Sequence, residues 1–196
     1  MKKLLMRVTA ALLVTAPLWA SDAPPTGMFT ADRRVQALRR HFPDVKLVTH
    51  EGQTRRFYQD LVQGKLVLIN FMYTRCEGSC PRVTPNLVKA QTELGKRTQR
   101  RVAMLSITVD PKNDTAQALK EYARQFRVGP GWHFLTGKKP EIDHIRRRLG
   151  VYDPDDQKSG HMNVLIIGNE ATGSWVALPA LSLPSDIADT AVRLMR

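Results

Sequence analysis

The sequence predicts an α/β protein in which helices flank a central mixed sheet. Continuous apolar runs, which are typical of strands buried on both faces, alternate with stretches of helical spacing. Near the C-terminus two strand-like runs follow each other with only a turn between them, which indicates an antiparallel hairpin. The chain has 196 residues, enough for one domain with a core of its own.

The first elements follow from apolar runs and turn residues. Residues 44–65 predict a short strand, a turn at Gly52, a second extended piece and a helical turn. The apolar run at 65–73 predicts a strand covered on both faces. A helix is expected from Pro81 to Lys96, and a second apolar strand at 101–110.

The remaining elements continue the alternation. They are a helix from Asp114 to Phe126 opened by the cap-like "NDT", a short strand at 132–137, a helix at 139–150, a hairpin within 161–179 and a final helix at 184–196. The resulting order is β-α-β-α-β-α-β-β-α. Parallel strands in the first half of the sheet and an antiparallel hairpin in the second half form the arrangement of a thioredoxin fold.

The first 34 residues are expected to precede the folded domain. Residues 1–20 begin with basic side chains and continue with an apolar stretch shorter than the ~20 residues that span a bilayer, which is typical of a secretory signal peptide. We expect residues 21–34 to be a flexible lead-in and residues 35–196 to form one domain. Such a protein is exported to the periplasm, or is anchored in the inner membrane facing the periplasm if the signal is not cleaved.

The chain is strongly basic, with 30 Lys and Arg against 18 Asp and Glu and a formal net charge of +12. Removal of residues 1–20, which carry three positive charges and no negative ones, leaves +9. The arginines occur in separate pairs and triplets, so we do not expect nucleic-acid binding. A basic face that contacts acidic partners or the anionic headgroups of a membrane surface is the functional interpretation.

Both cysteines of the chain, Cys76 and Cys80, lie between the predicted buried strand and the helix that follows it. Ligands of open α/β sheets collect at the carboxyl ends of strands, and a helix N-terminus favours a thiolate. The C-x-x-x-C spacing is one residue longer than the redox motif C-x-x-C, which lets both sulfurs point at one external atom. A structural disulfide, a redox pair and a pair of soft ligands for Cu(I) all remain open from these residues.

A copper site at this position needs a third ligand besides the two sulfurs. Histidine is available at five positions: His41, His50, His133, His144 and His161. We expect His144 on a helix surface and His133 in the core or at the sheet edge. His161 differs because it begins an apolar strand after a polar loop, in the segment that passes beside the cysteine turn in a thioredoxin fold.

Three stretches together resemble the SCO/SenC family of copper-binding, thioredoxin-fold proteins linked to cytochrome c oxidase assembly. They read "NFMYTRCEGSCPRVTPNL", "SITVDPKNDT" and "SGHMNVLIIGNE", and they occur in the family's order. The resemblance covers roughly residues 40–170. It implies that Cys76 and Cys80 are the copper-binding pair and that His161 is the third copper ligand. Asp110 matches an acidic position near that site.

The resemblance leaves two functions open. One is an exported metallochaperone that binds Cu(I), with Cu(II) binding undecided, and delivers it to the dinuclear copper site of a cytochrome c oxidase subunit or to another cuproprotein. The other is a thiol-disulfide oxidoreductase in which Cys76 and Cys80 are a redox pair that reduces a partner's cysteines and is itself renewed by a thiol reductant. His161 favours the first, because a simple oxidoreductase needs no histidine there.

Overall fold

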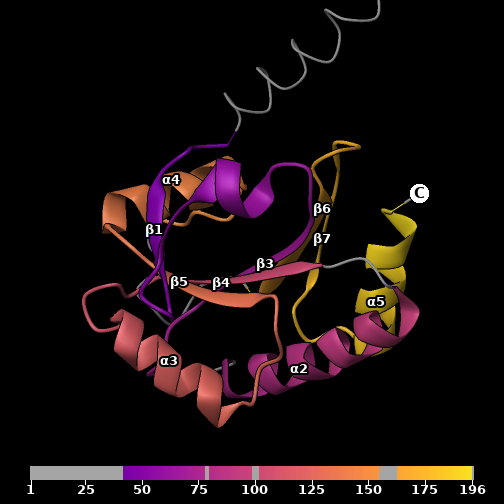
Figure 1. Ribbon diagram of the computed structural model, residues 1–196, viewed down its shortest axis with the longest axis horizontal. Coiled ribbons are helices and arrows are strands. Elements are labelled where there is room, and N and C mark those ends of the chain that lie inside the picture. Colours follow the sequence, from indigo (N-terminus) through magenta and orange to yellow (C-terminus); the bar gives the residue numbers. More distant parts are fainter. Residues whose placement is uncertain (1–41, 78–79, 99–101, 155–162, 196) are drawn as a thin grey trace, which may run out of the picture.

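A mixed sheet lies between two layers of helices in the computed structural model, which describes residues 42–77, 80–98, 102–154 and 163–195 (Figure 1). The strands are β1 (Lys46–Thr49), β2 (Thr54–Arg56), β3 (Leu66–Met72), β4 (Ala103–Thr108), β5 (Trp132–Thr136), β6 (Val164–Asn169) and β7 (Ser174–Pro179). Their order across the sheet is β2-β1-β5-β4-β3-β6-β7. Strands β3, β4 and β5 are parallel, and every other neighbouring pair is antiparallel.

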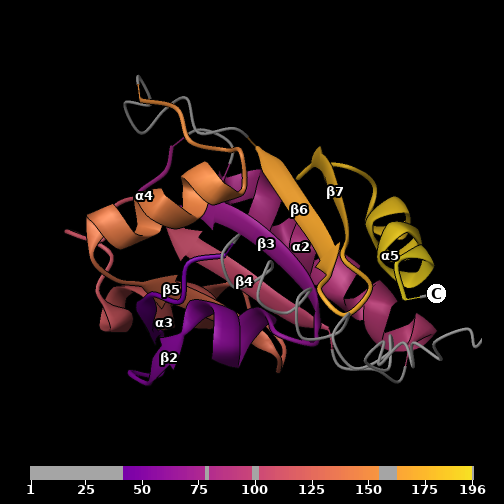
Figure 2. The ribbon, with the colours of Figure 1, turned by 90° about the horizontal axis from the view of Figure 1, so that it is seen from above.

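The helices divide between the two faces of the sheet, as Figures 1 and 2 show. They are the π-helical segment η1 (Phe57–Val62) and the α-helices α2 (Cys80–Arg97), α3 (Ala116–Gln125), α4 (Lys139–Arg148) and α5 (Pro184–Arg193). Side chains from α2, α3 and α5 contribute to one core cluster, and side chains from η1 and α4 contribute to the other. The sheet therefore separates two hydrophobic cores.

Strand β3 lies between these cores, and all seven of its residues are buried. Because successive side chains of a strand point to opposite faces, Leu68 and Met72 join the core on the α2 face, whereas Val67, Ile69 and Phe71 join the core on the α4 face. Such a strand needs apolar residues at nearly every position, which explains the uninterrupted run in the sequence.

One polar residue, Asn70, interrupts this run and is only 4% exposed. Its side-chain oxygen accepts a hydrogen bond from Ser106 Oγ on β4 (2.7 Å), and Ser106 Oγ accepts one from Trp132 Nε1 on β5 (2.9 Å). The chain of bonds links the three parallel strands. It satisfies polar groups that are costly to bury without partners.

A buried carboxylate fixes the chain where β3 begins. Glu170, 5% exposed, lies in the turn between β6 and β7 and accepts hydrogen bonds from Tyr58 Oη (2.9 Å) and from the backbone N–H of Gly64 (2.6 Å). Its own N–H donates to the carbonyl of Lys65 (3.0 Å). Segment η1 and the β6–β7 turn are thereby joined at one end of the sheet.

The predicted fold class, an α/β fold with a mixed sheet flanked by helices, is confirmed. One local prediction is wrong. The helix predicted from Asp114 begins at Ala116, where the hydroxyl of Thr115 accepts a hydrogen bond from the N–H of Ala118 (3.2 Å). Thr115 is therefore the cap, because the carboxylate of Asp114 is buried and has other partners.

Residues 1–41 lie outside the described residues. The signal peptide at 1–20, the lead-in at 21–34 and the start of the domain at residue 35 therefore stay predictions. Of the helices that the structure describes, none has the length and apolar character needed to cross a membrane.

Candidate functional site

The turn that carries Cys76 follows the carboxyl end of β3. The N–H of Cys76 donates to the carbonyl of Tyr73 (3.3 Å), which closes a tight turn directly after the strand. Cys76 is 8% exposed and belongs to the core on the α2 face, together with Val83 and Leu87 of α2. Its flanking residues Arg75 and Glu77 are exposed. The sulfur therefore sits at the border between an apolar core and a charged surface.

Cys80 is the first residue of α2, and its side chain lies outside the described part of the structure. The helix that it begins has 18 residues. The unpaired N–H groups at a helix N-terminus carry partial positive charge, which stabilises an anion such as a thiolate. Pro81 follows at a position where the absence of an N–H costs nothing.

Asp114 holds the turn after β3 in place. Its carboxylate accepts hydrogen bonds from the N–H of Thr74 (3.1 and 3.3 Å), from Thr74 Oγ1 (2.5 Å) and from Thr108 Oγ1. Asp114 is 1% exposed. Hydrogen bonds to a charged acceptor are about twice as strong as those between neutral groups. The position of the residues just before Cys76 therefore depends on a side chain from the β4–α3 loop.

The two loops meet because β3 and β4 are parallel neighbours. Met72 lies opposite Thr108, and the N–H of Val109 donates to the carbonyl of Met72 (2.9 Å), so both strands end at the same edge of the sheet. Asp110 follows there and is 7% exposed. Its carboxylate accepts a hydrogen bond from Asn113 Nδ2 (2.8 Å). The two loops thus form one polar layer at this edge.

Strand β6 begins at the same edge. It runs antiparallel to β3, with Leu165 opposite Asn70, so its first residue, Val164, lies near the end of β3. Immediately before it, Asn163 accepts a hydrogen bond at its carbonyl from the N–H of Ala180 (2.7 Å). Three chain segments therefore converge where β3 ends.

Comparison with known proteins identifies the family. The SCO1/SenC family profile matches residues 33–172, well over half of the chain. This chain belongs to the SCO1/SenC family. Among its relatives, the human mitochondrial SCO1 homologue is 32% identical over 107 residues, which cover 54% of this chain and 34% of the human protein. The chain spans between 34% and 63% of the length of the curated relatives compared with it.

Solved structures of SCO proteins share the fold. Arabidopsis thaliana ScoI, crystallised with copper bound, superposes with a TM-score of 0.67 at 24% identity, covering 79% of this chain and 98% of that one. BsSco, described as a member of the Sco family of cytochrome c oxidase assembly proteins, superposes with a TM-score of 0.65 at 22% identity, covering 76% and 90%. The thioredoxin-like fold predicted from the order of elements is therefore confirmed.

The structure brings together some of the residues predicted for the SCO site. Cys76, the backbone of Cys80 and Asp110 lie at the edge where β3 and β4 end. His161 lies outside the described residues, in the stretch 155–162. Within the described parts of the chain, no three His, Cys, Asp or Glu side chains are grouped closely enough to hold a metal ion. The ligand set therefore stays a prediction.

The other described histidines lie away from this edge. His144 is exposed on α4, as predicted. His50 follows β1 and accepts a hydrogen bond at Nδ1 from the N–H of Phe134 (3.2 Å), and its ring lies 6.5 Å from that of His133 on β5. Burial lowers the pKa of both imidazoles. These two histidines belong to the β1–β5 side of the sheet.

Asp114, Thr74 and Thr108 belong to this site, although the sequence pattern does not single them out. In the sequence, Asp114 fits the pattern of a helix-opening residue because it precedes a helical stretch. A signal was available, since threonines at the ends of two adjacent buried strands both need hydrogen-bond partners, and one nearby carboxylate can serve both. Pairing them requires the register of β3 and β4, which the sequence does not state.

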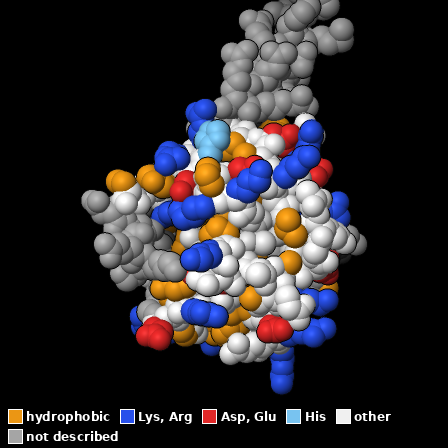
Figure 3. Space-filling view, turned by 90° about the vertical axis from the view of Figure 1, so that its left-hand side faces the viewer, with side chains coloured by type: hydrophobic (Ala, Val, Ile, Leu, Met, Phe, Trp, Pro, Cys, Tyr) orange, Lys and Arg blue, Asp and Glu red, His pale blue; other side chains and the backbone are white. Residues whose placement is uncertain are grey.

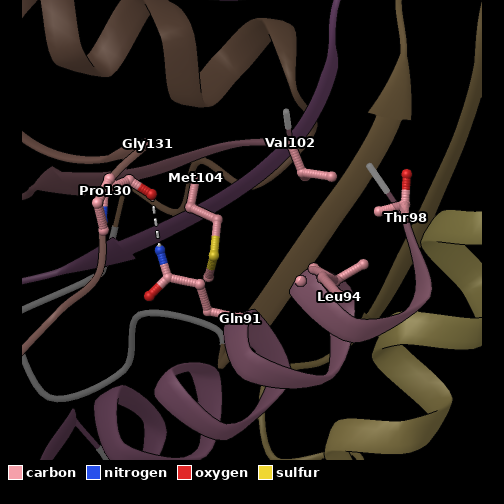
Figure 4. A pocket seen from close by; sticks show the side chains of 8 residues that line it. Gln91, Leu94, Thr98, Val102, Met104, Pro130 and Gly131 are labelled. Carbon is pink, nitrogen blue, oxygen red and sulfur yellow. Dashed lines mark hydrogen bonds between the residues drawn. The ribbon is translucent and has the colours of Figure 1, made fainter. Parts of the chain in front are cut away.

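The surface carries two further features. Figure 3 shows Lys and Arg side chains spread over one face among acidic and hydrophobic ones. A pocket of about 330 Å³ lies along the C-terminal half of α2, where Gln91 Nε2 donates to the carbonyl of Pro130 (3.2 Å) beside Leu94 and Met104 (Figure 4). Because Cys80 begins the same helix, this pocket is at the opposite end of α2 from the cysteine turn.

Proposed function

We propose that this SCO protein is a copper metallochaperone. It holds Cu(I) between the sulfurs of Cys76 and Cys80 and the imidazole of His161, and it delivers the ion to the copper site of a partner protein. The observation that carries the proposal is the convergence at one edge of the sheet. The cysteine turn after β3 is held by Asp114, the helix of Cys80 begins there, and β6 starts at Val164, three residues after His161.

The chemistry of these donors suits copper in its reduced form. Thiolates are soft ligands that select Cu(I), and imidazole accompanies them readily. His161 is three residues before Val164 in the sequence, so chain connectivity limits its distance from the edge where β3 ends. Two thiolates and one imidazole therefore suit Cu(I) as an ion that the protein carries and passes on.

The proposed acceptor is the copper-site subunit of cytochrome c oxidase. The support comes from the family, since BsSco is described as a cytochrome c oxidase assembly protein and the plant ScoI was crystallised with copper. We further propose that residues 1–20 direct the chain out of the cytoplasm to the periplasm. There the protein can reach the copper-site domain of the oxidase subunit. The basic surface suits contact with acidic groups.

A second function is supported by a specific observation. Cys76 and Cys80 flank a helix N-terminus, the setting of thiol-disulfide exchange, and BsSco is described as containing a disulfide switch. In this function one thiolate attacks a sulfur of the partner's disulfide and forms a mixed disulfide, and the second thiolate displaces the partner. Cys76 and Cys80 end as a disulfide, and the partner leaves as two thiols, having gained two electrons and taken up two protons from water. An external thiol reductant must then return both electrons.

Substitution of His161 separates the two functions. We expect reduced wild-type protein to bind one Cu(I) per chain, with both thiols protected from titration. His161→Ala removes one of three donors and should weaken Cu(I) binding about 10- to 100-fold, by analogy with other losses at metal sites. Formation and reduction of the cysteine disulfide should remain unchanged. Competition with a Cu(I) chelator and thiol titration measure these quantities.

His144→Ala is the matched control, since His144 is an exposed histidine on α4. It should change neither copper binding nor the redox reaction. If His161→Ala binds Cu(I) as tightly as wild type, the imidazole is not a ligand. If reduced wild-type protein binds no copper while its disulfide exchanges rapidly with a partner, the oxidoreductase function replaces the metallochaperone function.

A further inference from the structure

Two leucines in the connection between β7 and α5 extend into solvent. Leu183 is 64% exposed and Leu181 is 40% exposed, and among the described residues these are the large hydrophobic side chains with the greatest exposure. We name residues 180–183, Ala-Leu-Ser-Leu, the leucine loop. Isolated exposed leucines are common on protein surfaces, whereas two within three residues form a small apolar area that another molecule can cover.

The backbone of the leucine loop is fixed to α2. Asn86 Nδ2 donates to the carbonyls of both Ala180 (3.1 Å) and Ser182 (2.8 Å). The N–H of Ala180 in turn donates to the carbonyl of Asn163, just before β6. These bonds hold the backbone while the leucine side chains stay exposed. The leucines are therefore displayed on a defined surface.

This surface lies near the start of α2. Asn86 is six residues after Cys80, which corresponds to about 9 Å along the helix axis. Helices α2 and α5 lie side by side (Figure 1), and Arg97, at the C-terminal end of α2, forms an ion pair with Asp189 of α5. Since Asn86 meets the residues just before α5, the two helices run in the same direction. The leucine loop therefore flanks the end of α2 that carries the cysteine.

Leu183 is also an unfavourable choice for helix stability. It occupies the N-cap of α5, and its side chain makes no capping hydrogen bond. Asn, Asp or Ser at this position accepts a hydrogen bond from the first turn, whereas leucine leaves the N–H groups to water. Leu183 therefore provides no cap for α5, and its exposed side chain is available to contact another molecule.

The surface around the cysteine turn is charged. Arg75 and Arg82 are exposed, and neither forms an ion pair within the described parts of the chain. One exposed acid, Glu77, lies between them in the sequence. A molecule that covers both the leucine loop and the turn therefore meets an apolar area beside two arginines. Carboxylates on that molecule complement this charge.

We propose that the leucine loop is the docking surface for the metal-receiving protein, which presents an apolar patch with carboxylates beside its own copper site. This inference rests on the proposed function, because it takes the acceptor to be the copper-site domain of the oxidase subunit. Leu183 and Leu181 supply the apolar contact, and Arg75 and Arg82 orient the acceptor over the cysteine turn. The acceptor then docks on the leucine loop and the two arginines, whereas the copper ion is bound by other residues at the same end of the molecule.

The test uses the soluble copper-site domain of the oxidase subunit from the same organism, without metal, as the binding probe. Calorimetry gives its Kd for wild type and for Leu183→Asn. We expect the variant to bind this domain about 10- to 100-fold more weakly, the loss that corresponds to one buried leucine side chain. Its melting temperature should rise by about 2–4 °C, because Asn caps α5.

Ala171→Asn is the matched control, since Ala171 is an exposed apolar residue in the β6–β7 turn. It should leave the Kd unchanged. Affinity for Cu(I), measured by competition with a chelator, should be the same in wild type and both variants, so failure of metal binding is seen separately from failure of docking. Equal Kd values for wild type and Leu183→Asn would overturn the inference, as would the absence of binding by wild type.

A second pair of variants tests the charges. Arg82→Gln should weaken binding of the same domain a few-fold at low ionic strength and reduce the salt dependence of the Kd. Arg148→Gln, a change at an exposed arginine of α4, should do neither. If both variants bind alike, the proposed role of the arginines is wrong even where the leucine contact holds.

Discussion

The buried carboxylates at the two ends of β3 make similar hydrogen bonds but hold chain segments with different contents. Glu170 accepts bonds from Tyr58 Oη and the N–H of Gly64 where β3 begins. Asp114 accepts bonds from the hydroxyls of Thr74 and Thr108 and from the N–H of Thr74 where β3 ends. Each carboxylate joins two segments that are far apart in the sequence.

The two segments differ in the reactive side chains that they carry. Gly64 and Tyr58 belong to a connection that contains neither cysteine nor histidine, whereas Thr74 lies two residues before Cys76. A buried, fully bonded carboxylate therefore does not by itself mark a functional site. The reactive residues in the loop that it holds decide whether it serves only the fold or also the chemistry.

Asp114→Ala is expected to have the largest effect, because it acts on both fold and site. Loss of the carboxylate leaves Thr74 and Thr108 without their acceptor and should lower the free energy of unfolding by about 3 kcal/mol. Affinity for Cu(I) should fall about 10- to 100-fold, since the turn before Cys76 loses its anchor. Urea unfolding and chelator competition measure the two effects. Unchanged copper affinity in a destabilised protein would make Asp114 purely structural.

Glu170→Ala should have a somewhat smaller effect and only on the fold. Two hydrogen bonds are lost, so the free energy of unfolding should fall by about 2 kcal/mol. Copper affinity should match that of wild type, because this end of β3 is remote from the cysteine turn. The same two assays apply, under conditions where the variant is folded. A parallel loss of copper affinity would show that any destabilisation disturbs the site and would remove the contrast with Asp114.

A smaller effect is expected from acidification between pH 7.5 and 5.5. Burial places the pKa values of His50 and His133 below 6.5 in the folded protein, so the unfolded chain binds more protons in this range. The contribution of these two histidines to the free energy of unfolding is fully present above pH 6.5. It is lost as the pH falls from 6.5 through their lowered pKa values in the folded protein. Unfolding of the reduced, metal-free protein by urea at pH 7.5 and 5.5 measures the loss.

The double variant His50→Gln and His133→Gln should show a weaker dependence on pH over this interval. Glutamine has no proton to gain, so any remaining slope belongs to other groups. An unchanged slope would assign the pH dependence to groups other than these two imidazoles. This experiment therefore shows whether the pH dependence of stability arises from the two histidines on the β1–β5 side of the sheet.

The sequence predicts the sheet well and the supports of the site poorly. The strands β3 and β4 are evident because burial on both faces requires continuous apolar runs, and the cysteine turn is located by its position after β3. Asp114 escapes prediction because its partners are fixed by strand register, a property of the folded sheet. Thr115 directly after it also offers a capping hydroxyl, so both residues fit the same local pattern.

The distance in sequence between Thr74 and Asp114 has a consequence for the order in which the molecule matures. The two residues are 40 positions apart, and at the usual rate of synthesis about 2–8 s separate their appearance. Leu165, which pairs with β3 from the other side, appears later still. Both cysteines are therefore synthesised before the parts that fix their turn. Cys76 is only 8% exposed in the folded domain, so oxidants, reductants and metal ions have their freest access to its thiol before the domain has closed around it.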